Sequence, residues 1–301
     1  MGIDLAVATP SFLDLTFVGL ESLPRLGEER FASDLVRSPG GGAITAVGAA
    51  RLGLKAVLAA PLGNDVAGDL IMDVLSGDGV TTVERRAPRT PVTVVLPTGG
   101  DRAMVTVDPG VRASPADVAS LEPKAVSVNM DLMYVVPPGV DAYVTCGDDD
   151  ARAYAGRPPA QLAHARALFV SDGEALRLSG QPDVESAAEH LAGLASTVVV
   201  TLGARGAMAL IDGQRVEAPA FDAGPPVDAT GAGDLLVAAY VWADQLGTPP
   251  DERLRWAVIY AALSITTPTA VAGAAGLERL LEAGASVGLK APEGLSSSTT
   301  G

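Results

Sequence analysis

A carboxylate follows a glycine turn at the start of a long apolar segment. The stretch reads VDATGAGDLLVAAY, and in it Gly231, Ala232 and Gly233 lead into Asp234. Glycines let a ligand approach the backbone, and successive N–H groups before a helix form a positively polarised hollow that suits phosphate oxygens. Beside a bound phosphate, Asp234 could accept the proton of an attacking hydroxyl.

A simpler interpretation of the same residues is a helix N-cap, where aspartate is favoured and stabilises by about 1 kcal/mol. Two other phosphate-binding motifs fit less well. A dinucleotide fingerprint needs a third glycine where Leu236 stands, and a Walker loop needs a Gly-Lys-Ser/Thr sequence that does not follow. The residues alone leave the cap and the phosphate site both open.

Composition excludes several other functions for this chain of 301 residues. A formal charge of −15 argues against a nucleic-acid partner. No apolar segment reaches the roughly 20 residues that span a bilayer, so we expect no membrane insertion. Cys146 is the single cysteine, and His164 and His190 lie far apart, which makes a zinc site improbable. The unpaired cysteine and the lack of a signal-peptide pattern at the first residues predict a cytoplasmic protein.

The elements that must position this chemistry alternate between strands and helices. We expect strands within 3–9, 55–63, 165–171 and 196–203, and helices within 43–53, 65–80, 251–265 and 276–284 and from Asp234 onward. This alternation predicts an α/β fold with a mostly parallel central sheet.

Two segments break the alternation and read as antiparallel strands outside the main sheet. They cover about 15–39 and 90–107, and the second contains the turn-like sequence PTGGDR. We expect them to form a small β lid over the active face. The expected organisation is a single domain over 1–290, followed by a disordered tail, 291–301, that ends in GLSSSTTG.

The motif around Asp234 resembles the C-terminal signature of the ribokinase-like (PfkB) carbohydrate kinases. VVVTLGARGAMAL is similar to that family's nucleotide strand and loop, and EALRLSG to its glutamate segment near the metal. PGGGAITAVGAARLG followed by APLGNDVAGDLIMDVLSGDGV is similar to its N-terminal signature. The resemblance covers residues 3–284 and implies a ribokinase-like three-layer α/β/α fold. It also implies an ATP-dependent kinase that phosphorylates an alcohol hydroxyl of a small sugar or sugar-like substrate.

The resemblance assigns roles to the residues of the first motif and to the nucleotide site. Asp234 would be the general base, and Gly231, Ala232 and Gly233 the anion hole for the transferring phosphoryl group. The expected nucleotide-binding residues are Thr201, Gly203, Arg205, Gly206 and Thr230.

Further residues are assigned to the metals and to the acceptor. Glu174 would orient waters around Mg²⁺, and Asp228 would help order a loop for K⁺ that some family members have. Asp14 would bind sugar hydroxyls, with the backbone of Gly41 and Gly42 closing the pocket. Arg102, on a lid strand, could reach an anionic group, although a solvated arginine is the more common outcome on a hairpin. The family also implies a homodimer that pairs through lid strands.

Three positions depart from the family pattern. Ile44 stands where an asparagine usually binds substrate hydroxyls, Ser171 stands where an asparagine is usual near the metal, and TPSFLD lacks the glycine that normally precedes Asp14. The acceptor therefore remains open between sugars, sugar acids and nucleosides. Ile44 and Ser171 also motivate an alternative, a non-catalytic member that binds nucleotide or sugar.

Overall fold

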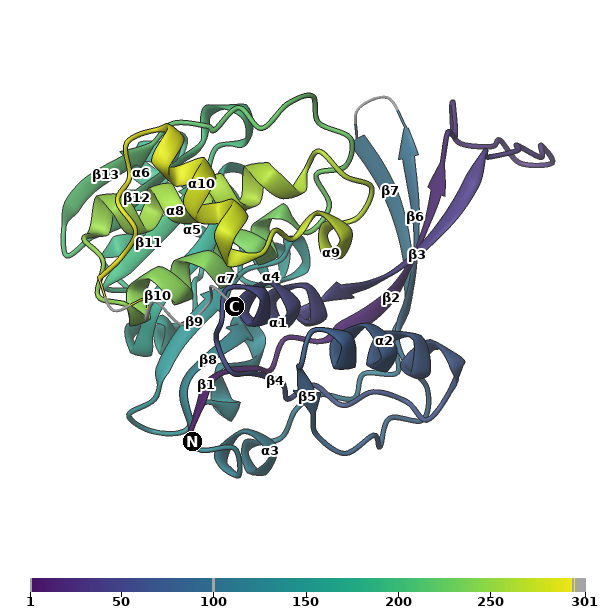
Figure 1. The fold of residues 1–301 in the computed structure, drawn as a ribbon, viewed down its shortest axis with the longest axis horizontal. Coiled ribbons are helices and arrows are strands. Elements are labelled where there is room, and N and C mark those ends of the chain that lie inside the picture. The colour runs from purple at the N-terminus through teal and green to yellow at the C-terminus, as the bar shows by residue number, and fades with distance from the viewer. Residues whose placement is uncertain (1, 99–100, 294, 296–301) are drawn as a thin grey trace.

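The computed structural model describes residues 2–98, 101–293 and 295, and its centre is a nine-stranded sheet (Figure 1). The strand order is β13-β12-β11-β10-β9-β8-β1-β4-β5. Neighbours are parallel except at β11–β12 and β12–β13, which are antiparallel. The strands are β1 (Ile3–Val7), β4 (Ala56–Leu58), β5 (Thr81–Thr82), β8 (Pro123–Asn129), β9 (Asp141–Thr145), β10 (Ala165–Ser171), β11 (Thr197–Thr201), β12 (Ala207–Ile211) and β13 (Gln214–Ala218).

Helices cover both faces of this sheet. One layer contains α1 (Gly42–Arg51), α2 (Val66–Gly77), α7 (Ala232–Gln245), α8 (Pro250–Ser264) and α10 (Leu277–Ser286). The other contains α3 (Pro115–Ala119), α4 (Asp148–Ala153), α5 (Asp172–Ser179) and α6 (Val184–Ala192). Successive residues of β1 alternate between the two cores, Leu5 and Val7 facing one and Ala6 the other. The predicted three-layer α/β/α architecture with a mostly parallel sheet is confirmed.

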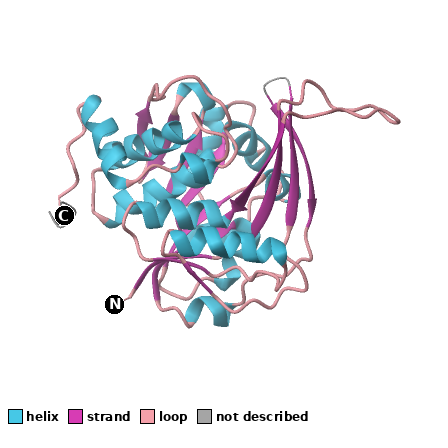
Figure 2. Cartoon of the chain, turned by 45° about the vertical axis from the view of Figure 1, so that its right-hand side comes forward, coloured by secondary structure: helices cyan, strands magenta, loops and turns pink. Residues whose placement is uncertain are grey.

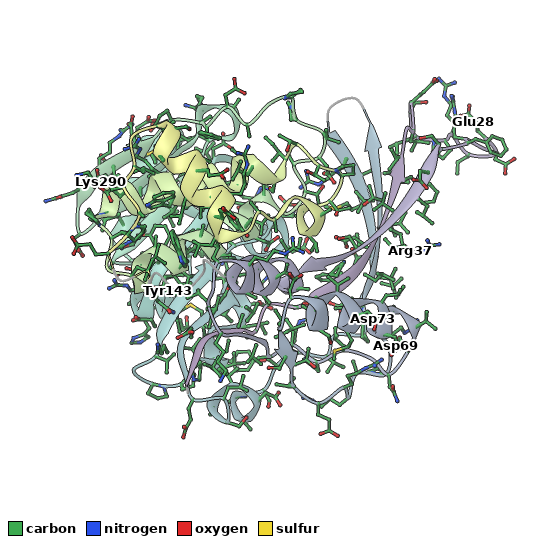
Figure 3. The ribbon with its side chains drawn as sticks, in the orientation of Figure 1. Glu28, Arg37, Asp69, Asp73, Tyr143 and Lys290 are labelled. Carbon is green, nitrogen blue, oxygen red and sulfur yellow. The ribbon has the colours of Figure 1, made fainter. Side chains whose placement is uncertain are left out.

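A second sheet stands beside the main body (Figure 2). It has the order β3-β2-β6-β7 and comes from the two segments that interrupt the alternation. The strands are β2 (Ser11–Val18), β3 (Asp34–Gly41), β6 (Val92–Thr98) and β7 (Asp101–Val107). The β2–β3 loop projects away from the body, with Glu28 near its end (Figure 3). Parts of two expected features, Gly99 and Gly100 at the β6–β7 turn and most of the 291–301 tail, lie outside the described residues.

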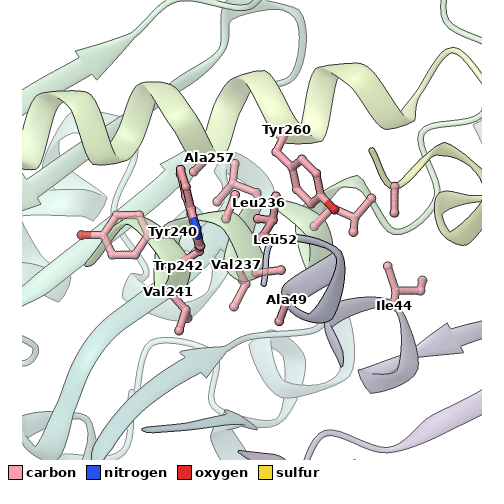
Figure 4. Packing of buried hydrophobic residues seen from close by; sticks show 14 of the residues in the cluster. Ile44, Ala49, Leu52, Leu236, Val237, Tyr240, Val241, Trp242, Ala257 and Tyr260 are labelled. Atoms are coloured by element: carbon pink, nitrogen blue, oxygen red, sulfur yellow. The ribbon is translucent and has the colours of Figure 1, made fainter. Parts of the chain in front are cut away.

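Close packing of buried apolar residues joins α1 to α7 (Figure 4). Gly48 permits this approach, because a Cβ there would lie 2.5 Å from Leu235 Cδ2. Further along α7, the buried rings of Trp242 and Trp256 meet edge to face, with centroids 5.8 Å apart. The starts of α1 and α7 are therefore held together by a continuous core. Among the helices of the described residues, none combines the length and apolar character that a bilayer crossing requires.

Candidate active site

The sheet topology indicates a ligand-binding position at the carboxyl ends of β1 and β8. In the main sheet the chain adds β4 and β5 on one side of β1 and β8 to β13 on the other, so the direction of winding changes between β1 and β8. In open α/β sheets, ligands bind outside the carboxyl ends of the strands at such a point. Gln245, at the far end of α7, donates to the carbonyl oxygen of Asp4 at 2.9 Å, near the amino end of β1. The start of α7 therefore points to the carboxyl edge.

The glycine turn begins α7, and Asp234 does not cap it. Gly231 is the N-cap residue, in the left-handed conformation with φ of 79°, and no side chain caps this end. Asp234 is the third residue of the helix, so the N-cap interpretation of this carboxylate is wrong. The first N–H groups of a helix lack intrahelical acceptors and favour an anion.

Gly231 also requires the absence of a side chain. A Cβ there would lie 2.5 Å from Ile44 Cδ1 and 2.7 Å from Ala270 Cβ. Ile44, which we expected at the substrate pocket, is 3% exposed (Figure 4), and its side chain packs against the glycine turn. Its side chain therefore supports the glycine turn.

Asp228 fixes the backbone that leads into this turn. One carboxylate oxygen accepts the N–H of Thr230 at 2.8 Å, and the other accepts the N–H of Thr269 at 3.3 Å. The N–H of Val227 also donates to the carbonyl oxygen of Ile265 at 2.7 Å. The Thr230 hydroxyl is buried and has no partner among the described residues. Asp228 thus joins two loops, and the Thr230 hydroxyl beside it lacks a partner within the described part of the chain.

Asp14 lies on β2 above a glycine that the sequence reasoning did not single out. A Cβ on Gly40 would lie 2.1 Å from Asp14 Oδ2, so only glycine permits the observed position of this carboxylate. Thr93, its register partner on β6, donates a hydrogen bond to it. The face of the second sheet that carries Asp14 is therefore shaped around this side chain.

Gly41 and Gly42, which we expected to close the pocket by their backbone, lie at the junction of β3 and α1. Gly41 has φ of 59°, and a Cβ there would lie 2.4 Å from the carbonyl oxygen of Pro10. A Cβ on Gly42 would lie 2.2 Å from the carbonyl oxygen of Thr9. Both glycines let α1 begin directly against the chain that follows β1.

Asp14 and Asp234 are close enough for the charge of one to act on the other. Burial, reinforced by the charge of Asp14 and opposed by a hydrogen bond from Thr45, raises the pKa of Asp234 to about 7. Burial also raises the pKa of Asp14 to about 7, opposed by the Thr93 hydrogen bond and reinforced by the charge of Asp228. Carboxyl groups that change charge near neutral pH in one site suit proton transfer.

The predicted nucleotide residues follow the carboxyl end of β11. Thr201 ends this strand, in register with Ser171 of β10. Gly203 and Gly206 have positive φ values of 57° and 92°, and the loop closes through a 2.8 Å hydrogen bond from the N–H of Leu202 to the carbonyl oxygen of Gly206. Arg205 is exposed and lies 3.9 Å from Asp172. These residues form a compact turn at the same edge of the sheet.

Glu174 belongs to a capping box at the start of α5. Its carboxylate accepts the N–H of Ser171 at 2.7 Å, and the Ser171 hydroxyl accepts the N–H of Glu174 at 3.3 Å. Burial raises the pKa of Glu174, opposed by these bonds. The Ser-x-x-Glu spacing is the sequence signal for such a cap, and our sequence reasoning did not use it.

Mg²⁺ fits this donor set only through water and phosphate. Among the described residues, no three His, Cys, Asp or Glu side chains are grouped to hold a metal directly. Mg²⁺ commonly keeps several waters and binds substrate phosphates beside one or two carboxylates. Glu174, with one oxygen engaged in the cap, suits contact through water.

Arg102 is not brought to the carboxylates. Thr93 of β6 pairs with Asp14 of β2 on one side and with Thr106 of β7 on the other. Arg102 lies four residues from Thr106 along β7, which separates it from the level of Asp14 by about 13 Å. Arg102 is exposed on the same face of the second sheet.

Known proteins share both the sequence pattern and the fold. The sequence profile described as "pfkB family carbohydrate kinase" matches residues 17–134 and 142–275. A ribokinase of Bacillus subtilis (strain 168) is 29% identical over 260 residues, covering 80% of this chain and 86% of that protein.

Solved structures agree at the level of the fold. The structure of Arabidopsis thaliana ribokinase complexed with ribose and ATP has a TM-score of 0.79 at 24% identity, covering 94% of this chain and 99% of the other. A nucleoside kinase of Methanocaldococcus jannaschii has a TM-score of 0.77 at 17% identity, covering 94% and 98%. Because the profile matches most of the chain, this protein belongs to the pfkB family of carbohydrate kinases.

Proposed function

We propose that this ATP-dependent carbohydrate kinase transfers the γ-phosphoryl group to a hydroxyl of a small neutral sugar, with Asp234 as general base. The observation that carries this proposal is the carboxylate of Asp234 at an uncapped helix start, beside Asp14. Ionised Asp234 accepts the proton of the acceptor hydroxyl while the hydroxyl oxygen forms a bond to the γ-phosphorus. The bond from this phosphorus to the bridging oxygen of the β-phosphate breaks, and ADP leaves. Asp14 accepts a hydrogen bond from another hydroxyl and so orients the acceptor.

The turn of Gly231, Ala232 and Gly233 supplies backbone N–H groups that can bind the phosphoryl group. Its N–H groups and the start of α7 stabilise the charge that develops on the phosphoryl oxygens. A positioned base contributes about 10²- to 10⁴-fold, and each backbone donor of this kind about 10²- to 10³-fold. Bound Mg²⁺ would neutralise charge on the β- and γ-phosphates. Thr201, Gly203, Arg205, Gly206 and Thr230 would line the nucleotide.

Three observations favour a neutral sugar over the alternatives. Asp14, Asp228 and Asp234 are acidic, and Arg102 lies about 13 Å along the sheet, so these residues favour a neutral acceptor over a sugar acid. Ile44 packs against Gly231, so a contact within the protein already accounts for its apolar side chain without a nucleobase. Ser171 keeps Glu174 in place through the capping box, which removes a motive for a non-catalytic role.

The second sheet offers an interface for a homodimer. It exposes large apolar side chains on its edge strand, with Met104, Val105 and Val107 at 53%, 64% and 52% exposure. Leu26 and Phe31, on the projecting loop, are 106% and 83% exposed. Exposed apolar groups on an edge strand are commonly covered by a partner, and a second copy of this sheet is the occupant we propose.

Asp228, the residue expected at a K⁺ loop, is held by backbone hydrogen bonds. Both carboxylate oxygens of Asp228 already accept backbone N–H groups, which accounts for this residue without an ion. Turnover in potassium chloride against choline chloride tests a K⁺ requirement, and removal of Mg²⁺ with a chelator tests the divalent cation.

The main test is an ATP-consumption screen over neutral sugars, polyols, sugar acids and nucleosides. With the best acceptor, Asp234→Asn should lower kcat by 10²- to 10⁴-fold and leave ATP binding within about threefold. Asp73→Asn is a matched control, since Asp73 is exposed on α2 (Figure 3). Wild-type turnover by Asp234→Asn would exclude this base, and a preference for sugar acids would exclude the neutral acceptor.

A further inference from the structure

The hydroxyl of Thr45 lies against the proposed base. Thr45 is in the first turn of α1 and is 1% exposed. Its Oγ1 is 3.5 Å from Asp234 Oδ1 and 3.4 Å from the carbonyl oxygen of Asp234, across 189 residues of sequence. No other side chain of the described residues hydrogen-bonds to the Asp234 carboxylate. These separations are long for hydrogen bonds, and such contacts often tighten when substrate binds.

A hydroxyl can follow a change of charge on its partner because it both donates and accepts. When Asp234 is ionised, the Thr45 hydroxyl donates to Oδ1. When Oδ1 carries a proton, that proton can be donated to Thr45 Oγ1, while the Thr45 proton turns to the carbonyl oxygen of Asp234. The geometry offers a partner for the hydroxyl proton in both states.

We infer that Thr45 is a positioning residue that holds the Asp234 carboxylate and preserves its hydrogen bond before and after proton transfer. This inference rests on the proposed function of Asp234. In the step, the O–H bond of the acceptor breaks, an O–H bond forms on Asp234, and Thr45 gains and loses no proton. Its hydroxyl only rotates.

The position of Thr45 also links the acceptor segment to the base. The backbone of Gly41 and Gly42 leads directly into the turn of α1 that carries Ile44 and Thr45. Ile44 packs against Gly231, and the next residue contacts Asp234. A displacement of the start of α1 would therefore move the support of the glycine turn and of the base together.

The kinetic test compares Thr45→Val, which removes the hydroxyl, with Thr45→Ser, which keeps it. Thr45→Val should lower kcat about tenfold, with the acceptor KM within about twofold. The midpoint of its pH–rate profile should rise, since the Thr45 hydrogen bond lowers the pKa of Asp234. Thr45→Ser should restore both. A wild-type kcat and midpoint in Thr45→Val, or equal impairment in the serine variant, would overturn the inference.

A control lies at the opposite end of α7. The buried Thr248 hydroxyl donates to the carbonyl oxygen of Ala243 at 3.0 Å. Thr248→Val removes the same group and should lower the stability without moving the midpoint of the pH–rate profile. A shifted midpoint in this control would show that the profile reports general loosening of the helix.

A second readout does not depend on turnover. We would measure urea unfolding between pH 5 and 9 for wild type, Thr45→Val, Asp234→Asn and the double variant. The effect of removing the Thr45 hydroxyl should depend on pH with Asp234 present and become independent of pH when asparagine replaces this aspartate. Additive effects at every pH would refute the contact. A failed acceptor screen would leave this result unaffected, so the two proposals fail separately.

Discussion

The two ends of α7 each carry an aspartate, and their surroundings differ in every respect that matters for chemistry. Asp244 is 3% exposed in its side chain and accepts hydrogen bonds from Tyr143 at 2.5 Å and Arg166 at 2.8 and 2.9 Å, with Arg253 at 2.9 Å. Asp234, ten residues earlier, has only the long contacts from Thr45 among the described side chains. One carboxylate is fully paired and the other is held nearly alone.

The pKa values follow from this difference. Burial by itself would raise the pKa of Asp244, but the bonds from Arg166 and Tyr143 and the charge of Arg253 lower it. At Asp234 burial acts with the charge of Asp14, and the pKa rises to about 7. A buried carboxylate that serves the fold is paired, whereas one that must exchange a proton is left with few partners.

The largest effect on stability should come from removing the ion pairs of Asp244 at the end of α7. Asp244→Ala leaves Arg166 and Arg253 without their partner, so we expect the free energy of unfolding to fall by about 3–5 kcal/mol. Urea denaturation measures this loss. In the folded fraction kcat should stay within about threefold, because the change lies at the other end of the helix. A loss below about 1 kcal/mol would mean that the ion pairs contribute little, which Arg166→Lys would check by removing only the two-point contact.

Asp234, at the start of α7, should control the pH dependence of turnover. Asp234 must be ionised to accept a proton, so kcat should fall about tenfold per pH unit below about pH 7 and reach a plateau above it. Initial rates at saturating ATP and acceptor, from pH 5.5 to 9, measure the profile. A flat rate between pH 6 and 8 would contradict the raised pKa.

The smallest expected effect is on stability. Replacing Asp234 should stabilise the protein, whereas replacing Asp244 should destabilise it. A carboxyl whose folded pKa is raised stabilises the protein below its unfolded value, and this stability is lost as pH rises to the folded value. For Asp234 the window runs from about 4 to about 7. Asp234→Asn should therefore be more stable than wild type by about 1–2 kcal/mol at pH 8, with little difference near pH 4. A less stable variant at pH 8 would show that ionised Asp234 is well solvated.

Sequence reasoning located the elements whose signals are local. The strand expected within 165–171 is β10, because a continuous apolar segment there is followed by a helix start. The strands β8 and β9 were not identified, since short apolar segments between irregular stretches do not distinguish strand from helix. The start of α7 lies at Ala232 and not at Asp234, because Gly231 adopts the left-handed conformation that ends the preceding turn.

The sequence predicted which residues form the site, but not which neighbours their side chains contact. The motifs pointed to Asp14, Asp234 and the glycine turn, and the structure brings these residues to one edge of the sheet. The inward packing of Ile44, the contact of Thr45 with Asp234 and the contact of Gly40 with Asp14 depend on how distant segments pack. Periodicity along one helix cannot specify which neighbour a side chain meets.

Because α7 is held in place at Asp244, the number of residues between Asp244 and Asp234 determines the direction in which the Asp234 side chain points. Each residue of an α-helix turns the chain by about 100° and advances it by about 1.5 Å. With the Asp244 end fixed by Tyr143, Arg166 and Arg253, a single inserted residue before it would swing Asp234 by more than a quarter turn. Every residue between the two aspartates is buried, so substitutions there that keep an apolar side chain of similar volume should be tolerated better than any change in the number of residues.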